Sequence, residues 1–175
     1  MKKELYCCFL FCCIIFLCKA QRGEDYILTL QQDTLFGKIE MEQGQDPITF
    51  SHNKKKINYH PSTIQYFGIF ENKQYQRFKS LTSLGGKSIF VKILVEGKIK
   101  VYKYTEEHVY PNSTLNRYVY LMGYSDDALV TVSSSAYQRM VGYFLKEHPN
   151  LLLELANYSF DEVPQIIEQY NERTK

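Results

Sequence analysis

The chain has 175 residues, enough for one domain with a sizeable core, and its 21 Lys and Arg nearly balance its 19 Asp and Glu. This balance excludes the broad basic surface of nucleic-acid-binding proteins, so we expect no nucleic-acid partner. All five cysteines lie within the first 18 residues. The rest of the chain therefore has no thiol for a disulfide, a thiolate metal site or a cysteine nucleophile.

The first twenty residues are typical of a secretory signal peptide. Lys2 and Lys3 give a basic start, Leu5–Leu17 is almost continuously apolar, and Ala20 places a small residue before Gln21. The apolar run is shorter than the roughly 20 residues of a membrane-spanning helix. We therefore expect cleavage between Ala20 and Gln21, export from the cytoplasm, and no transmembrane span in the mature chain.

Cys18 leaves a second interpretation open. Bacterial lipoproteins are cut before a lipidated cysteine, and the sequence leading to Cys18 has roughly that outline, although Leu17 stands where a small residue is normal. Lipidation at Cys18 would anchor the protein to a membrane. The small-residue rule favours cleavage after Ala20 instead.

From residue 26 to about residue 133 the pattern predicts short strands separated by polar turns. The expected strands are Tyr26–Leu30, Thr34–Met41, Ile48–Phe50, Ile57–Tyr59, Ile64–Phe70, Tyr75–Leu81, Ile89–Val95, Ile99–Val101, Arg117–Tyr124 and Ala128–Val132. Ile89–Val95 is apolar on both faces, which indicates a strand that lies inside a sheet or is covered on its second face. Lys54–Lys56 lies in the polar loop Ser51–Lys56 and is interpreted as solvated surface rather than as a basic binding patch.

After residue 133 the apolar residues change to helical spacing. Ser133–Ser135 supplies hydroxyl groups for a helix N-cap, and a helix is expected up to His148-Pro149. Ser159 and Glu162 predict a capping box ahead of a second helix, in which Pro164 is tolerated only in the first turn.

Strands followed by helices predict an α+β fold. We expect an antiparallel sheet or a partly closed barrel over residues 21–133. A helical segment over residues 134–175 would pack on the same domain, after the signal peptide of residues 1–20.

Several short motifs resemble a known group of proteins. Tyr26–Leu30 followed by Asp33–Ile39 is similar to the opening Y-I-V-T-L…G-D-T-L-x-G-K-I of uncharacterised exported proteins from Bacteroidetes-type bacteria. Val91–Lys98 resembles their central hairpin, and the tail resembles theirs with Glu147-His148-Pro149 in place of Asp-Cys-Pro. The resemblance covers most of the chain and implies the periplasm or the cell surface. It brings no known activity and therefore no site residue.

Motifs for metal and catalytic chemistry are absent from the sequence. No histidine pair has the His-Glu-x-x-His spacing of a zinc site, and Glu106–His108 is interpreted as a polar stretch between strands. Gly85–Ser88 resembles the end of a phosphate-binding loop but lacks its first glycine and precedes a strand. With no Gly-x-Ser-x-Gly either, we expect no metal, no cofactor and no catalytic residue. A glycosidase-type carboxylate pair stays open, because its spacing exists only in the folded protein.

Tyrosines are the candidate binding residues. Fourteen follow residue 20, and the chain has no Trp. Tyr102 and Tyr104 share one strand face, Tyr118 and Tyr120 share another, and neighbouring hairpins would bring the two pairs together. A ring with a hydroxyl group suits surfaces that bind sugars, peptides or proteins. The simpler explanation is that tyrosine is a good strand former.

One modification site is also a candidate. Asp33-Thr34-Leu35 resembles the O-glycosylation acceptor pattern of the same bacterial group, which would make Thr34 the modified residue. Its simpler interpretation is a turn leading into a strand.

Three functions remain open. The first is a non-enzymatic binding or interaction protein of the bacterial envelope, with a protein, a glycan or a small ligand as partner. The second is a carrier of small apolar ligands in a β-barrel cavity. The third is a hydrolase of envelope polymers, for which residue types exist but no constellation does.

Overall fold

The computed structural model describes residues 23–41, 46–82, 86–110 and 113–175, with the side chains of 107–110 and 113–116 left aside. The predicted cleavage residues Ala20 and Gln21 and the alternative lipidation site Cys18 lie outside the described residues. Within the described ranges, no helix combines the length and the apolar character needed to cross a membrane.

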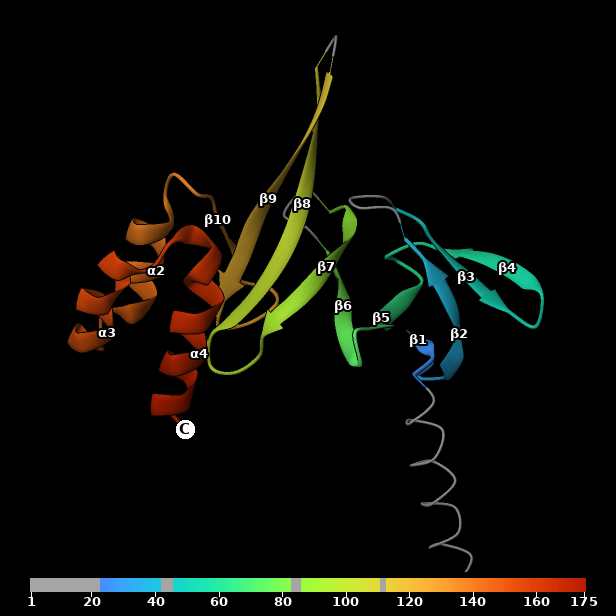
Figure 1. Ribbon diagram of the computed structural model, residues 1–175, viewed down its shortest axis with the longest axis horizontal. Helices are drawn as coiled ribbons and strands as arrows, with labels where there is room; N and C mark the ends of the chain where they lie inside the picture. The colour runs from blue at the N-terminus through green and yellow to red at the C-terminus, as the bar shows by residue number, and fades with distance from the viewer. Residues whose placement is uncertain (1–22, 42–45, 83–85, 111–112) are drawn as a thin grey trace, which may run out of the picture.

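Antiparallel strands form one open sheet that runs across the molecule (Figure 1). The strands are β1 (Asp25–Thr29), β2 (Thr34–Glu40), β3 (Ile48–His52), β4 (Lys55–Tyr59), β5 (Ile64–Glu71), β6 (Gln74–Thr82), β7 (Ser88–Val95), β8 (Lys100–Tyr110), β9 (Ser113–Gly123) and β10 (Val130–Val132). Their order is β10-β9-β8-β7-β6-β5-β1-β2-β3-β4, so β4 and β10 are the edges. The predicted α+β fold with an antiparallel sheet is confirmed, and the sheet does not close into a barrel.

Two hairpins have Asn-Lys at the two central positions of their turns. Asn53 and Lys54 have φ of 49° and 64°, and Asn72 and Lys73 have 51° and 65°. Positive φ at both central residues is the two-residue turn that matches the twist of a hairpin, and Asn tolerates it well. The first turn is therefore tighter than the predicted loop, because β3 and β4 extend into it.

Two of the three lysines of the predicted surface loop lie on the edge strand β4, and Lys54 lies in the turn before it. Lys55 and Lys56 begin β4, and both are exposed. The Lys56 ammonium forms an ion pair with the Glu40 carboxylate, at 3.1 Å. Lysine on an edge strand hinders pairing with the sheet of another molecule.

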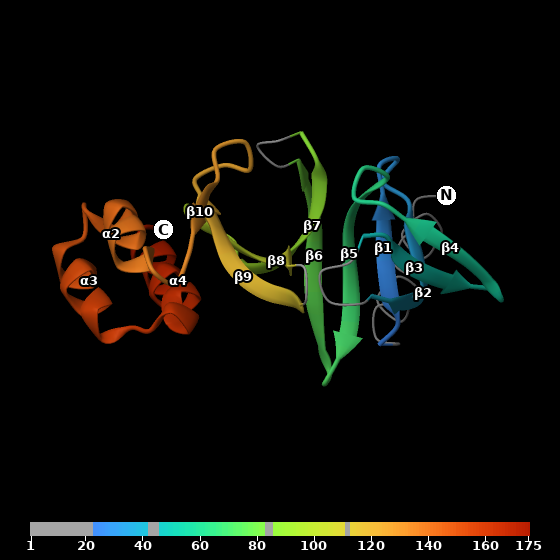
Figure 2. The same ribbon diagram turned by 90° about the horizontal axis from the view of Figure 1, so that it is seen from above.

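Helices gather at the β10 end of the sheet (Figure 2). They are α2 (Tyr137–Leu145), α3 (Pro149–Glu154) and α4 (Val163–Arg173), with 3-10 turns η1 (Leu155–Asn157) and η2 (Phe160–Glu162). The capping box is confirmed, since the Ser159 amide and hydroxyl both donate to the Glu162 carboxylate, at 2.8 and 2.6 Å. Pro164 lies in the first turn of α4, as predicted.

The predicted serine cap of the first helix is wrong. The N-cap of α2 is Ala136, with no side-chain hydrogen bond to the helix. The hydroxyls of Ser133 and Ser135 contact each other at 3.1 Å, because Ser133 to Ala136 forms a turn before the helix begins.

The sheet has two faces with separate cores. The helices cover one face of β7–β10, which we call the helix face; Val101, Tyr120 and Met122 are buried there against α2–α4. The opposite face, which we call the loop face, is crossed by the β9–β10 loop and buries residues such as Val91 and Tyr102. A further cluster fills the N-terminal end of the sheet.

β7 carries apolar side chains into all three clusters. Ile89, Val91 and Ile93 are buried on the loop face. On the other side, Phe90 packs against the N-terminal cluster and Leu94 against the helix cluster. This is the doubly apolar strand that the sequence predicted.

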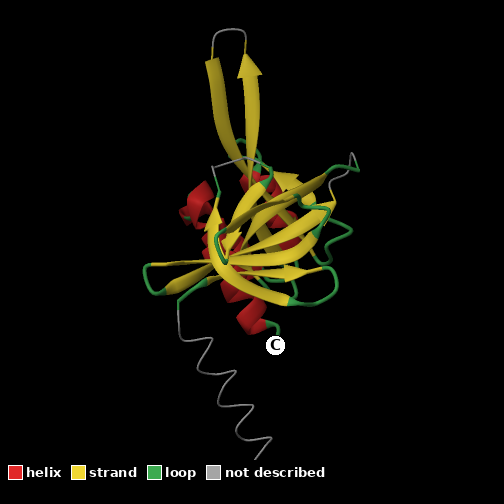
Figure 3. Ribbon diagram, turned by 90° about the vertical axis from the view of Figure 1, so that its right-hand side faces the viewer, coloured by secondary structure: helices red, strands yellow, loops and turns green. Residues whose placement is uncertain are grey.

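β8 and β9 continue beyond their neighbours as an arm. β7 pairs with β8 only as far as Lys103, and β10 pairs with β9 only from Tyr120 to Met122. β8 and β9 stay paired to Tyr110 and Ser113, so the outer end of the hairpin projects alone, whereas Tyr118 near its base packs on Phe160 (Figures 1 and 3). We call this part, residues 104–110 and 113–119, the arm.

Candidate functional site

Two neighbouring strands separate near the turn that links β6 to β7. β5 and β6 are paired up to Tyr66 and Lys79, whereas β6 and β7 remain paired to Thr82 and Ser88. In the described pairing, the last residues of β6 therefore have a strand on one side only. The beginning of β5 is held away from β6 by its pairing with Thr29 of β1, across an irregular step in the register.

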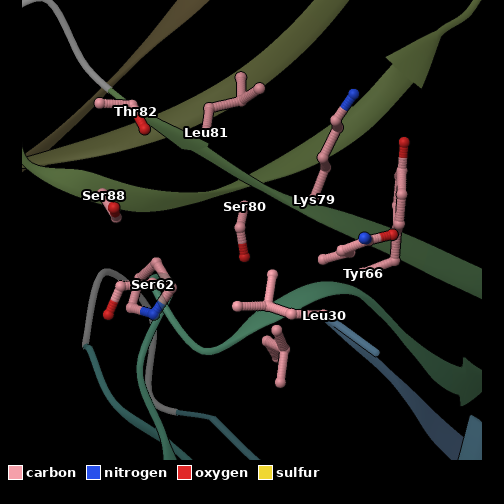
Figure 4. Close-up of a pocket in the computed structure, with 11 residues that line it drawn as sticks. Leu30, Ser62, Tyr66, Lys79, Ser80, Leu81, Thr82 and Ser88 are labelled. Carbon is pink, nitrogen blue, oxygen red and sulfur yellow. The ribbon is translucent and has the colours of Figure 1, made fainter. Parts of the chain in front are cut away.

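A hollow of about 380 Å³ occupies this gap (Figure 4). Leu30, Ile64 and Leu81 give it apolar walls. Its hydroxyl groups come from Ser62, Ser80, Thr82 and Ser88. Unlike the enclosed and mostly apolar pockets that typically hold small molecules, this hollow is open to solvent and its lining is polar and apolar in about equal parts.

Ser80 is the unusual residue of this hollow. Its Oγ is buried and has no hydrogen-bond partner in the described part of the chain. In Figure 4 the oxygen points across the gap toward the side of Leu30. Leaving a buried hydroxyl unpaired costs about 1–3 kcal/mol, so the fold retains an unfavourable polar group beside the hollow.

An ion-pair cluster lies beside the hollow on the loop face. Asp126 of the β9–β10 loop accepts hydrogen bonds from the ammonium groups of Lys79 and Lys100, the latter at 3.0 Å, and from the Tyr102 hydroxyl at 2.7 Å. The Lys79 ammonium also lies 5.2 Å from the ring centroid of Tyr66. We call Lys79, Lys100, Tyr102 and Asp126 the Asp126 cluster.

Contacts within the cluster shift the pKa values of Asp126, Tyr102 and Lys79. Burial alone would raise the pKa of Asp126, but hydrogen bonds from Lys79, Tyr102 and Lys100 outweigh it and lower that pKa to about 2. Burial raises the pKa of Tyr102, and its bond to the Asp126 carboxylate raises it further. Burial opposes the charge of Lys79, yet its bonds to Asp126 and Tyr66 raise the pKa of Lys79 overall. At neutral pH the cluster is therefore a fixed carboxylate between two ammonium groups.

The Asp126 cluster holds the β9–β10 loop on the sheet. It also keeps the charged end of Lys79 out of the hollow. Figure 4 shows the Lys79 nitrogen and the Tyr66 hydroxyl pointing away from Ser80 and Leu30. Only the stems of these two side chains line the hollow. Its polar character therefore comes from neutral hydroxyl and amide groups.

The structure separates the four predicted tyrosines into two pairs. Tyr102 pairs with Leu121 and Tyr104 with Val119, which places Tyr118 and Tyr120 on the other face of the hairpin. Tyr102 and Tyr120 are 1% and 3% exposed, so neither offers a ring to a partner. The expectation that the two pairs meet on one surface is corrected, because odd-numbered residues of β9 pair with even-numbered residues of β8.

The helix-face tyrosines hold the helical segment. The rings of Tyr118 and Tyr120 lie 5.4 and 4.7 Å from that of Phe160, and the Tyr118 hydroxyl donates to Asp161. Lys103 lies over the Tyr118 ring, 3.9 Å from its centroid. Tyr104 is half-buried on the loop face against the Tyr102 side of the core. A binding role for Tyr104 or Tyr118 stays a prediction.

The other residues considered from the sequence lie apart from the hollow. Thr34 is exposed at the start of β2, so an O-glycan there stays a prediction. The side chain of His108 lies outside the described residues, as does Gly85. In the described ranges no group of three His, Cys, Asp or Glu side chains is placed to hold a metal ion.

Sequence reasoning missed the residues that define this site. Ser80 belongs to a strand whose pattern is ordinary, and nothing in the sequence shows that its neighbour strand ends early. Asp126 was placed correctly in the turn between β9 and β10, but its three partners come from β6 and β8.

Comparisons leave the family open: no family model, curated protein or solved structure matches the chain.

Proposed function

We propose that this chain is an exported, non-enzymatic binding protein of the bacterial envelope and that its ligand occupies the hollow between β5 and β6. The observation that carries the proposal is the buried Ser80 hydroxyl, which has no partner in the described chain and faces that hollow. Export is supported by the first twenty residues, and the envelope location by the resemblance of the sequence motifs.

The lining of the hollow favours a small neutral ligand. Lys79 is the charged residue of the lining, and its ammonium is engaged by Asp126 outside the hollow. A charged ligand would have to be desolvated without an opposite charge to pair with it. A molecule with a hydroxyl or carbonyl for Ser80 and an apolar part for Leu30, Ile64 and Leu81 fits this lining best.

The carrier hypothesis assumed a different architecture. It needed a sheet closed into a barrel around an apolar cavity, whereas this sheet is open between β4 and β10. The proposed ligand site lies at a local separation of two strands instead. The hydrolase hypothesis has no supporting arrangement in the described residues and stays untested.

Native mass spectrometry of the protein purified from its own cell envelope tests the proposal. We expect a discrete mass adduct on the unsubstituted protein that disappears on denaturation. Ser80→Val removes the hydroxyl and fills part of the hollow with a larger side chain. This variant should lose at least nine-tenths of the adduct.

Ser51→Val is the matched control. Ser51 also lies in a strand and also has a buried, unpartnered Oγ, but it lines a different hollow near Phe36 and Gly37. This variant should keep the adduct. A bare mass for the unsubstituted protein, or equal retention by both variants, would refute the assignment of the site.

A further inference from the structure

The end of β6 presents main-chain groups as well as a side chain to the hollow. A two-residue turn joins β5 to β6, so the closing pair Glu71 and Gln74 exchange main-chain hydrogen bonds. Hydrogen-bonded pairs alternate with pairs that are not, which directs the amides and carbonyls of even-numbered β6 residues toward β5 and those of odd-numbered residues toward β7. The described pairing of β5 with β6 ends at Lys79. The main-chain groups of Ser80 and Thr82 therefore point into the gap, beyond the last pair.

The opposite wall of the gap contains a β-bulge. Two adjacent residues of β1 pair with Ile64 and Tyr66, so Gln65 between them is an extra residue in β5. A bulge bends its strand and interrupts pairing, which accounts for the departure of β5 from β6 at this point. Gln65 lines the hollow, and its side-chain amide group can both donate and accept a hydrogen bond.

The hollow offers apolar contacts on both faces of the sheet. Figure 4 shows Leu81 and Ser80 pointing to opposite sides of β6, with Leu30 on the side of Ser80. Leu81 belongs to the loop-face core, and Ile64 belongs to the N-terminal cluster. Successive side chains of a strand point to opposite faces, so a strand lying in the gap would contact Leu81 with one side chain and the wall of Leu30 and Ile64 with the next.

We propose, given the ligand site proposed above, that its occupant is an uncharged segment of an extended peptide, which adds to the β6 edge at Ser80 and Thr82 as a short strand. A peptide unit carries a donor and an acceptor at the spacing of the strand edge. Its main chain would pair with β6, and its alternate side chains would reach the two apolar walls. Because the hollow is open to solvent and polar over about half of its lining, the segment can enter and leave it with both ends in water.

A library of tetrapeptides tests this chemical class. The probes combine Ala, Val, Ile, Thr and Gln, and they are acetylated at one end and amidated at the other, so they carry no charge. Affinity selection on the purified protein, read by mass spectrometry, should retain peptides with apolar residues at alternate positions. Ser80→Val should retain less than one-tenth of the amount that the unsubstituted protein retains, whereas Ser51→Val should retain as much. Circular dichroism checks that both variants keep the strand content.

N-methylation of a selected peptide tests the main-chain pairing. Successive N–H groups of a strand point to opposite edges, so methylation should raise the Kd at least tenfold at alternate positions. At the positions between them the change should be less than threefold, because those N–H groups point toward the part of β5 that has left the ladder. Isothermal titration calorimetry measures each Kd. Equal effects at every position, or no effect at any, would overturn the strand pairing.

Two further outcomes distinguish the peptide class from the site itself. If the envelope-purified protein carries an adduct that Ser80→Val loses, but the library yields no bound peptide, the ligand is not a peptide and the site stands. If the protein carries no adduct and binds no peptide, both the site and the peptide class are refuted.

Discussion

At the scale of single residues, Asp126 organises the loop face. Its carboxylate joins a loop between β9 and β10 to lysines on β6 and β8, and to the buried Tyr102. Partly buried ion pairs with several hydrogen bonds are worth more than exposed pairs, because solvent screens them less. The adjacent Arg77–Glu96 pair, roughly half exposed on both sides, should contribute little.

We predict that Asp126→Asn lowers the free energy of unfolding by about 1–2 kcal/mol at pH 7. The pKa of Asp126 falls from its ordinary 3.8 to about 2 on folding, so the stabilisation is fully present above about pH 4 and is lost as pH falls through 2. Urea unfolding of both proteins between pH 2 and pH 7 measures this. A stability difference that does not shrink toward pH 2 would contradict the assigned pKa.

Ser80 gives the opposite expectation for stability. Replacing an unpartnered buried hydroxyl by an apolar group removes a desolvation cost, so Ser80→Val should leave the free energy of unfolding unchanged or raise it by up to about 1 kcal/mol. Thermal unfolding of ligand-free protein measures this. A loss of more than about 1 kcal/mol in Ser80→Val that is also seen in the smaller Ser80→Ala would show that the hydroxyl serves the fold and not a ligand.

The residue scale is where sequence reasoning is least complete. The face of each tyrosine follows from the pairing of β8 and β9: Tyr104 is opposite Val119, and a shift by one residue would have placed it opposite Tyr118 or Tyr120. The chemistry of Ser80 depends on where β5 ends, which is set by contacts with β1 that are distant in sequence.

At the scale of elements, one buried amide adds hydrogen bonds to the apolar packing that holds the last helix on the sheet. Asn171 of α4 is 6% exposed; its Oδ1 accepts from the Ile99 amide, and its Nδ2 donates to the Ile99 carbonyl, both at 2.8 Å. The side chain thus acts as a strand edge for the β7–β8 turn. Gly97 makes room for it, since a Cβ there would lie 2.5 Å from Nδ2.

We predict that Asn171→Ala lowers the free energy of unfolding by about 2–3 kcal/mol, because it leaves the buried amide and carbonyl of Ile99 unpaired. Glu172→Ala, at the exposed neighbouring position, should change it by less than about 0.5 kcal/mol. Chemical unfolding measures both. Equal effects would mean that helix propensity, not the Ile99 contact, governs this position.

Structural features that depend on a few adjacent residues were predicted well from the sequence. The Ser159–Glu162 capping box and the position of Pro164 depend on a few adjacent residues, and both were found as predicted. The prediction that a serine caps α2 was wrong. Three successive serines are compatible with a turn as well as with an N-cap, and the sequence does not distinguish the two structures. The arm was not predicted, since its extent depends on where β7 and β10 stop pairing with it.

At the scale of the whole molecule, one open sheet supports three cores. Apolar residues that alternate along the first part of the chain and then recur at helical spacing were sufficient to predict an α+β fold, because both spacings can be recognised from the sequence alone. The pairing of β1 with β5, the separation of β5 from β6 and the projection of the arm depend on contacts between distant residues, which local sequence patterns do not reveal. The proposed ligand site rests on one of these features, the separation of β5 from β6.

A crystal structure of the protein purified from its own envelope tests the central claim most directly. We expect electron density for a small organic molecule in the hollow, with an oxygen or nitrogen within about 3 Å of Ser80 Oγ and an apolar part against Leu30 and Leu81. A structure in which β5 stays paired with β6 as far as Thr82, with Ser80 Oγ bonded inside the protein and no hollow between the strands, would contradict the account.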